Sequence, residues 1–169
     1  ALDAKGEKMR YIRLELAPEE SSAGVDRLVE LGFIGANVTY PHKQAAFSKA
    51  ARRDSLSSAT GAVNTLSFVD GMIYGFNTDG PGFVAAIRYP YFLDVRDLKI
   101  LLLGAAGGAG TSIAFACAQN NCERLILANR TFEKARTLEN QLRPMLTDEN
   151  RLSGATDRLS SIELADSKS

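Results

Sequence analysis

The sequence predicts an α/β fold built from two successive α/β units. Segments with the period-two pattern of strands alternate along the chain with segments of helical spacing. From Lys99 onward the order is strand, glycine-rich loop, helix, strand, helix, strand. That order is typical of one half of a doubly wound parallel sheet. We therefore expect an N-terminal α/β domain followed by part of a Rossmann-type doubly wound domain.

Composition and charge exclude several classes of partner. The 169 residues carry 20 basic and 20 acidic side chains, so the net charge is zero. This balance supplies no positive field for nucleic acid or for an anionic membrane surface. No apolar run reaches the about 18 residues that a membrane span requires. We expect neither nucleic acid nor membrane as a partner, no metal site, and a cytoplasmic location.

The first unit begins with a strand over residues 9–16, where apolar residues recur near period two. A helix is expected over residues 25–31, ended by Gly32, and a second strand over residues 33–39. Pro41 suits the first turn of a helix over about residues 42–51.

A β-hairpin is predicted around the Asp-Gly pair at 70–71, the favoured two-residue turn between the alternating segments 65–69 and 72–76. The two ends of the hairpin carry Asn64 and Asp79, which we expect to lie close together. A short helix over residues 83–92, interrupted by Pro90, and a polar linker complete this unit.

Lys43 and Asp79 each have two interpretations. Lys43 is expected in the first turn of its helix, where the helix dipole disfavours a positive charge, and this placement suits a proton-transfer group. The alternative is a solvated surface lysine. Asp79 precedes Gly80 and suits the N-cap of the following helix, a role that is compatible with catalysis.

The second unit opens with a continuous apolar strand over residues 99–103 and a glycine-rich loop. Its helices are expected over residues 109–120 and 131–146, with strands over residues 124–128 and 158–164. Both cysteines belong to this unit and lack the C-x-x-C spacing. They are Cys117 and Cys122, which we expect to be free thiols that are buried or half-buried.

The glycine-rich loop indicates a dinucleotide site. Glycines between a buried strand and a helix let backbone amides approach a pyrophosphate at the helix N-terminus. The spacing is G-x-x-G-G-x-G, and alanines occupy the second and third glycine positions of the usual G-x-G-x-x-G signature. A tight turn without a ligand is the alternative. The candidate cofactor contacts are Gly104, Ala106, Gly107, Gly108 and Ala109.

The end of the second strand of this unit favours NADP over NAD. An NAD site usually carries an acidic residue there, to bind the ribose hydroxyls. The sequence has Arg130 instead, and Lys134 follows one helical turn later. A guanidinium can pair with a 2′-phosphate in a fork geometry. The candidate contacts are Asn129, Arg130, Thr131 and Lys134; exposed helix-start residues are the alternative.

Three motifs in a fixed order resemble the shikimate dehydrogenase family, including its shikimate/quinate relatives. They are Asn-Val-Thr-Tyr-Pro-His-Lys at 37–43, Ala-Val-Asn-Thr at 62–65 and Asn-Thr-Asp-Gly at 77–80, and the glycine-rich loop follows them. The resemblance covers most of residues 9–135, the central part of the family pattern. The N-terminal serine-containing motif and the later strands of that pattern do not occur in this sequence.

The resemblance implies a catalytic pair and a set of substrate contacts. Lys43 and Asp79 would be the catalytic pair, and Thr39, Asn64 and Asp79 would contact the hydroxyls of a cyclohexene acid. The implied reaction is the NADP-dependent reversible reduction of 3-dehydroshikimate to shikimate, in aromatic amino acid biosynthesis. His42 is expected to be a helix-start residue beside the site rather than a proton shuttle.

The resemblance also implies the domain organisation. Residues 1–93 would form a substrate-binding and catalytic domain without its N-terminal strand. Residues 94–169 would form the first half of an NADP-binding Rossmann domain. Two alternatives stay open: a quinate/shikimate dehydrogenase that uses NAD or NADP, and a truncated fragment or pseudo-enzyme without catalysis. The sequence does not predict the oligomeric state.

Overall fold

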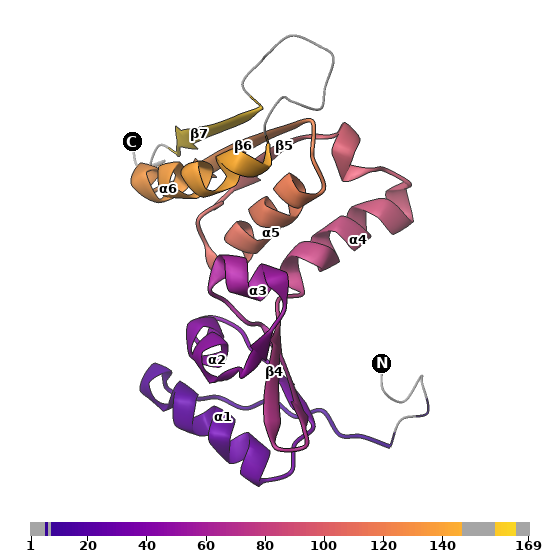
Figure 1. Ribbon diagram of the computed structural model, residues 1–169, viewed down its shortest axis with the longest axis vertical. Helices are drawn as coiled ribbons and strands as arrows, with labels where there is room; N and C mark the ends of the chain where they lie inside the picture. Colours follow the sequence, from indigo (N-terminus) through magenta and orange to yellow (C-terminus); the bar gives the residue numbers. More distant parts are fainter. Residues whose placement is uncertain (1–5, 7, 147–157, 165–169) are drawn as a thin grey trace.

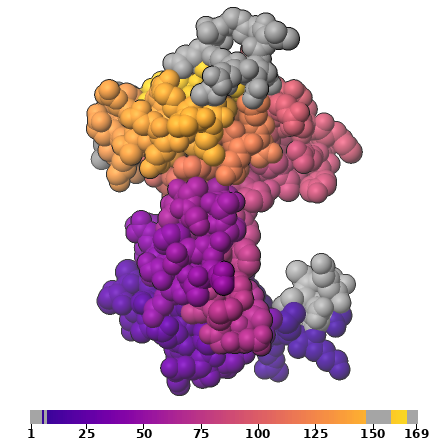
Figure 2. Space-filling model, viewed as in Figure 1, coloured from indigo at the N-terminus to yellow at the C-terminus, as the bar shows by residue number. Residues whose placement is uncertain are grey.

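The computed structural model describes residues 6, 8–146 and 158–164, and it contains two β-sheets (Figure 1). Each sheet has its own hydrophobic core. The first sheet and its helices form the lower half of the view, and the second sheet forms the upper half. This is an α/β fold, as the sequence predicts. Figure 2 shows that the purple surface around residues 50–60 meets the orange surface of the second half.

The first sheet has four strands in the order β1-β3-β4-β2. Its strands are β1 (Gly35–Asn37), β2 (Arg52–Arg53), β3 (Thr65–Val69) and β4 (Met72–Phe76). Its helical segments are the 3₁₀ turn η2 (Pro18–Glu20) and the helices α1 (Ser21–Glu30), α2 (Lys43–Lys49) and α3 (Ser55–Thr60). The core of this half is small and aliphatic; its buried members are Val25, Ala46, Ala50, Val63 and Leu66.

The predicted hairpin is confirmed. Strands β3 and β4 pair antiparallel with Val69 opposite Met72, and the turn residues Asp70 and Gly71 have φ angles of 49° and 73°. Two consecutive positive φ angles are the signature of the tight turn that matches the twist of the strands. Pairing of Thr65 with Phe76 closes the opposite end of the hairpin, next to Asn64.

The strand predicted over residues 9–16 is wrong. No residue of this segment pairs with a strand of the described chain. Tyr11 and Ile12 are 73% and 51% exposed, and one hydrogen bond of 3.3 Å joins Tyr11 Oη to Asn37 Oδ1. A strand needs a hydrogen-bonding neighbour at about 4.8 Å. The alternation of apolar residues is present, but the described part of the chain places no strand beside it.

Several element boundaries differ from the sequence prediction. The first helix begins four residues early, at Ser21, because η2 leads directly into it. Residues 52–60, for which no element was expected, form β2 and α3; the Asp54 carboxylate caps α3 by accepting from the Ser57 N–H at 2.7 Å. Pro90 does not interrupt its helix: it lies in the last turn, and the helix continues to Tyr91.

The second sheet has three parallel strands in the order β5-β6-β7. Its strands are β5 (Lys99–Leu103), β6 (Arg124–Asn129) and β7 (Leu159–Glu163). Its helical segments are α4 (Asp79–Tyr91), η3 (Val95–Asp97), α5 (Gly108–Gln119), α6 (Phe132–Leu142) and η4 (Arg143–Met145). The predicted strand-helix-strand-helix-strand order of a half Rossmann domain is confirmed.

One face of the second sheet is buried and the other is open. Leu125 and Leu127 of β6 are completely buried against the helices. Leu101 and Leu103, which point to the other face, are 55% and 64% exposed. Both cysteines are buried in this core, as expected, and neither forms a disulfide. Burial raises the pKa of the Cys117 thiol to about 12.

The helices α3 and α4 connect the two halves. Leu56 of α3 and Val84 of α4 belong to the core of the second sheet, although α3 precedes the hairpin of the first. Both helices pack against α5, the helix that follows the glycine-rich loop. Within the described residues, no helix is long and apolar enough to cross a membrane.

Candidate active site

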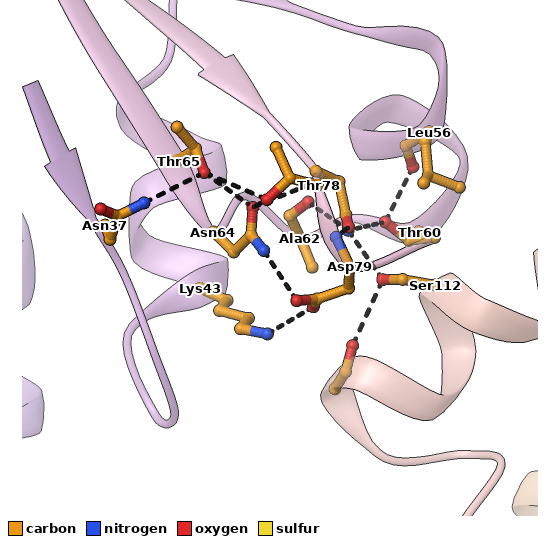
Figure 3. Close-up of polar contacts among 12 residues, drawn as sticks. Asn37, Lys43, Leu56, Thr60, Ala62, Asn64, Thr65, Thr78, Asp79 and Ser112 are labelled. Carbon is orange, nitrogen blue, oxygen red and sulfur yellow. Dashed lines mark hydrogen bonds and ion pairs between the residues drawn. The ribbon is translucent and has the colours of Figure 1, made fainter. Parts of the chain in front are cut away.

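Lys43 and Asp79 form an ion pair between the two halves of the chain. Lys43 is the first residue of α2, Asp79 is the first residue of α4, and Lys43 Nζ lies 2.6 Å from Asp79 Oδ2 (Figure 3). The side chains are 16% and 21% exposed, so the pair is partly withdrawn from water but open on one side. The carboxylate also lies at a helix N-terminus, where the dipole favours negative charge.

Backbone hydrogen bonds fix Lys43 in place. The segment before it contains a cis peptide bond between Tyr40 and Pro41. The Val38 N–H donates to the Asn64 carbonyl at 2.7 Å, and the Val63 N–H donates to the Lys43 carbonyl at 3.1 Å. The start of α2 is therefore bound on both sides to the residues that enter the hairpin.

Asn64 holds the second oxygen of the carboxylate. Its Nδ2 donates to Asp79 Oδ1 at 2.7 Å, and its Oδ1 accepts from the Thr78 N–H at 2.9 Å (Figure 3). The hydroxyls of Thr65 and Thr78 also lie within 3.2 Å of that oxygen. Each Asp79 oxygen thus has its own donor, and the predicted proximity of Asn64 and Asp79 is confirmed.

This cluster can supply a proton to a developing negative charge. An ammonium group has three N–H donors, and Asp79 engages one of those on Lys43. The remaining donors can reach an oxygen placed on the open side of the pair. An ammonium held in this way can stabilise an alkoxide and then protonate it, which is the role of a general acid.

Thr39 and His42 lie near the cluster but are not joined to it. Thr39 is exposed, and its side chain forms no hydrogen bond with the described part of the chain. His42 Nδ1 lies 2.6 Å from the hydroxyl of Ser21, which itself donates to the Pro18 carbonyl, so the imidazole N–H donates to that hydroxyl. The imidazole is therefore directed towards α1. Both residues line a hollow of about 170 Å³ beside residues 10–16; Lys43 and Asp79 are outside it.

The glycine-rich loop leaves the first amides of α5 available. Gly104 has a φ angle of 71°, and the loop closes with a hydrogen bond of 2.9 Å from the Gly107 N–H to the Gly104 carbonyl. The first intrahelical bond is donated by Thr111, so the amides of Gly108, Ala109 and Gly110 precede it. A Cβ on Gly108 would meet no atom within 4 Å, which leaves a ligand room to approach.

Sequence reasoning missed Gly110. A Cβ at this position would overlap the carbonyl oxygens of Gly104 and Ala105, so only glycine allows α5 to pack this closely on the loop. Close packing of helix on strand is the usual task of the third glycine of the signature. Gly110 is the last glycine of the G-x-x-G-G-x-G pattern, so the pattern itself could have indicated this packing role.

The basic residues lie at the same edge of the second sheet as the loop. Gly104 and Ala105 both donate to the Ala128 carbonyl, at 2.8 and 3.1 Å, so β6 ends directly beside the loop. Arg130 and Lys134 follow and are exposed. Asn129 Nδ2 donates to the Thr131 carbonyl at 3.0 Å and shapes the connection to α6. Within the described residues, no group of three or more His, Cys, Asp or Glu side chains could hold a metal ion.

Comparison with known proteins gives matches in both halves of the chain. The family profile described as "Shikimate dehydrogenase substrate binding domain" matches residues 1–66. The profile described as "Shikimate / quinate 5-dehydrogenase" matches residues 88–165. The chain is 38% identical over 133 residues to a shikimate dehydrogenase (NADP(+)) of Methanopyrus kandleri, a match that covers 79% of this chain and 46% of that relative.

Solved structures show the same similarity. A shikimate dehydrogenase in complex with NADP+ superimposes with a TM-score of 0.81 and 34% identity, over 95% of this chain and 54% of the other. The shikimate 5-dehydrogenase of Thermus thermophilus in complex with shikimate gives a TM-score of 0.78 and 29% identity, over 96% of this chain and 55% of the other. The chain belongs to the shikimate dehydrogenase family, and it spans about half the length of the curated relatives it matches.

Proposed function

We propose that the chain is a shikimate dehydrogenase-type oxidoreductase that reduces 3-dehydroshikimate reversibly to shikimate with NADPH. The observation that carries the proposal is the cluster in which one carboxylate is held by both Lys43 and Asn64, at 2.6 and 2.7 Å. The cluster lies at the start of α4, which packs against the helix of the glycine-rich loop. In this proposal the proton donor and the dinucleotide site occur in one fold.

The chain's own residues would act on the substrate as follows. The Lys43 ammonium binds the carbonyl oxygen, stabilises the alkoxide that forms there, and donates its proton to it. Asp79 orients Lys43 and accepts a hydrogen bond from a ring hydroxyl; Asn64 and Thr39 are the further hydroxyl contacts. Bound NADPH supplies the hydride. General acid help of this kind contributes about 10²–10⁴ in rate.

The cofactor would lie along the carboxyl edge of the second sheet. The amides of Gly108 and Ala109 would receive the pyrophosphate, with Gly104, Ala106 and Gly107 shaping the turn. Arg130 and Lys134, with Asn129 and Thr131, would receive the adenosine ribose and its 2′-phosphate, which favours NADP over NAD. In this proposal residues 1–93 bind the substrate and residues 94–169 bind the cofactor.

The proposed partner is thus a small polyhydroxylated acid. The proposed compartment is the cytoplasm, supported by two cysteines that are buried in the second core and form no disulfide. Quinate is the second candidate substrate, because the profile that matches residues 88–165 is described as shikimate / quinate 5-dehydrogenase. Quinate carries one more ring hydroxyl than shikimate, which is a difference that a binding site can distinguish.

The test is NADP+ reduction followed at 340 nm with shikimate and quinate side by side, using this chain. We expect turnover with shikimate and NADP+, and weaker turnover with quinate or with NAD+. Faster turnover with quinate would favour the second candidate. If the chain unfolds cooperatively, and is therefore folded, but turns over neither acid, the proposal is contradicted. That result would support a fragment without catalysis.

A further inference from the structure

The side chain of Asn77 is almost completely buried at the point where the first sheet ends and α4 begins. It is 1% exposed, and its Nδ2 has three acceptors: the Ser112 hydroxyl at 2.7 Å, the Ala62 carbonyl at 3.1 Å and the Thr60 hydroxyl at 3.2 Å. Its Oδ1 accepts from the Asp79 N–H at 3.2 Å. Asn77 therefore contacts both the candidate catalytic carboxylate residue and the second half of the chain.

Ser112 continues this connection to the glycine-rich loop. It is completely buried in α5, and its hydroxyl donates to the carbonyl of Gly108, the first residue of that helix, at 3.3 Å. A chain of three hydrogen bonds then leads from the Asp79 amide through Asn77 and Ser112 to Gly108. In Figure 3 Ser112 projects from its helix towards the turn that carries Asp79.

The backbones around these hydrogen bonds are packed without spare room. A Cβ on Gly80 would lie 2.8 Å from the Ser112 carbonyl oxygen, from Ala116 Cβ and from Leu56 Cδ2. The first turn of α4 consequently rests directly on α5. Asp54 fixes the other side of the turn, because its carboxylate accepts from the Asn77 N–H at 3.1 Å.

We propose that Asn77 and Ser112 are positioning residues that hold Asp79 at a fixed place relative to the start of α5. This inference rests on the proposed function, in which Asp79 orients the proton donor and the start of α5 binds the cofactor. Hydride transfer needs the two reactants in near-contact geometry, and a misplacement of about 1 Å can cost about 10²-fold in rate. Of the three acceptors around the Asn77 amide nitrogen only the Ser112 hydroxyl belongs to α5, so that one bond ties the buried amide to the helix of the glycine-rich loop.

The test uses Ser112→Ala, which removes only the hydroxyl. Ser57→Ala is the matched control, because Ser57 is equally buried on the neighbouring helix α3 and its hydroxyl has no hydrogen-bond partner among the described residues. The first measurement, without ligand, is amide hydrogen exchange followed by NMR. We expect the Asp79 amide to exchange about tenfold faster in Ser112→Ala, and no change in Ser57→Ala. The Val63 amide, which is bonded to the Lys43 carbonyl, should keep its rate in both.

The second measurement is the rate of the NADP+-dependent reaction. We expect kcat to fall about tenfold in Ser112→Ala, with the KM values for acid and cofactor nearly unchanged, and no change in Ser57→Ala. Unchanged Asp79 exchange, or equal acceleration of Asp79 and Val63, would overturn the inference, because the hydroxyl would then have no local role or only a general stabilising one. An unchanged kcat with faster exchange would also overturn it. If the unmodified chain shows no turnover, the proposed function fails, and exchange alone decides whether Ser112 holds Asp79.

Discussion

The two candidate binding regions of this chain are organised in opposite ways. In the first region, where the two halves meet, side chains are already bound to one another: Asp79 is held by Lys43 and Asn64, and Asn64 by Thr78. At the edge of the second sheet, the groups suited to a nucleotide are backbone amides and the exposed Arg130 and Lys134. Chemistry needs a preorganised cluster, whereas binding of a charged ligand can use groups that stay solvated until it arrives.

Removing the ammonium of Lys43 should perturb the first region most strongly. We expect Lys43→Ala to lower kcat by about 10²–10⁴-fold with a modest change in KM, because the proton donor is lost while the hydroxyl contacts remain. Lys49→Ala is the control, since Lys49 belongs to the same helix but lies outside the cluster. Its Nζ pairs with Asp26 Oδ2 at a distance of 2.5 Å. Steady-state kinetics with shikimate measure both. Equal activity of the two variants would remove Lys43 from the mechanism.

Reversing the charge of Arg130 tests the nucleotide edge. We expect Arg130→Asp to weaken NADPH binding by about 10–100-fold, because a charge-assisted fork to the 2′-phosphate becomes a repulsion, and to change NADH binding far less. Arg136→Asp, on an exposed position of α6, is the control. Calorimetric titration with each cofactor gives the dissociation constants. Equal losses for NADPH and NADH would show that Arg130 does not select the phosphate.

Truncating Asn64 tests how much of the first region depends on its internal hydrogen bonds. We expect Asn64→Ala to lower kcat/KM about tenfold and the free energy of unfolding by about 1–3 kcal/mol, because Asp79 Oδ1 loses its donor and the Thr78 N–H its acceptor. Asn37→Ala removes exposed hydrogen bonds of 3.3 and 3.4 Å and should cost little. Urea unfolding and kinetics together check this. An Asn64→Ala variant as stable as Asn37→Ala would show that the cluster is not preorganised by Asn64.

The weakest change that we expect is the pH dependence that Cys117 gives to the second core. Burial, and then the neighbouring Cys122, raise the pKa of its thiol from 9.0 to about 12. The unfolded chain loses this proton near pH 9 while the folded chain keeps it, so the free energy of unfolding should fall as pH rises from 9 to 12. The free energy of unfolding should fall by at most about 1.4 kcal/mol per pH unit. Urea unfolding at about pH 8 and about pH 10 gives the change in the free energy of unfolding between the two pH values. We expect this change to be smaller in Cys117→Ala than in the unmodified chain, and an identical change in both would exclude Cys117 as the cause.

Local patterns predicted the parts of the fold that are set by neighbouring residues. The hairpin follows from an Asp-Gly turn between alternating segments, and the start of the Rossmann half follows from an apolar strand with glycines after it. Residues 9–16 show the limit of this approach. Their alternation is that of a strand, but a strand exists only where another strand offers hydrogen bonds, and that is a property of distant residues.

The candidate site shows the same division. Residue types and their order established which groups are present: a lysine at a helix start, an asparagine and an aspartate at the ends of one hairpin, and a glycine loop followed by an arginine. Folding in three dimensions was needed to give one carboxylate two separate donors and to bring Asn77 to Ser112 across 35 residues. The same packing explains why Gly110 must lack a side chain. These contacts depend on how helices from the two halves pack, and such packing leaves no periodic signal in the sequence.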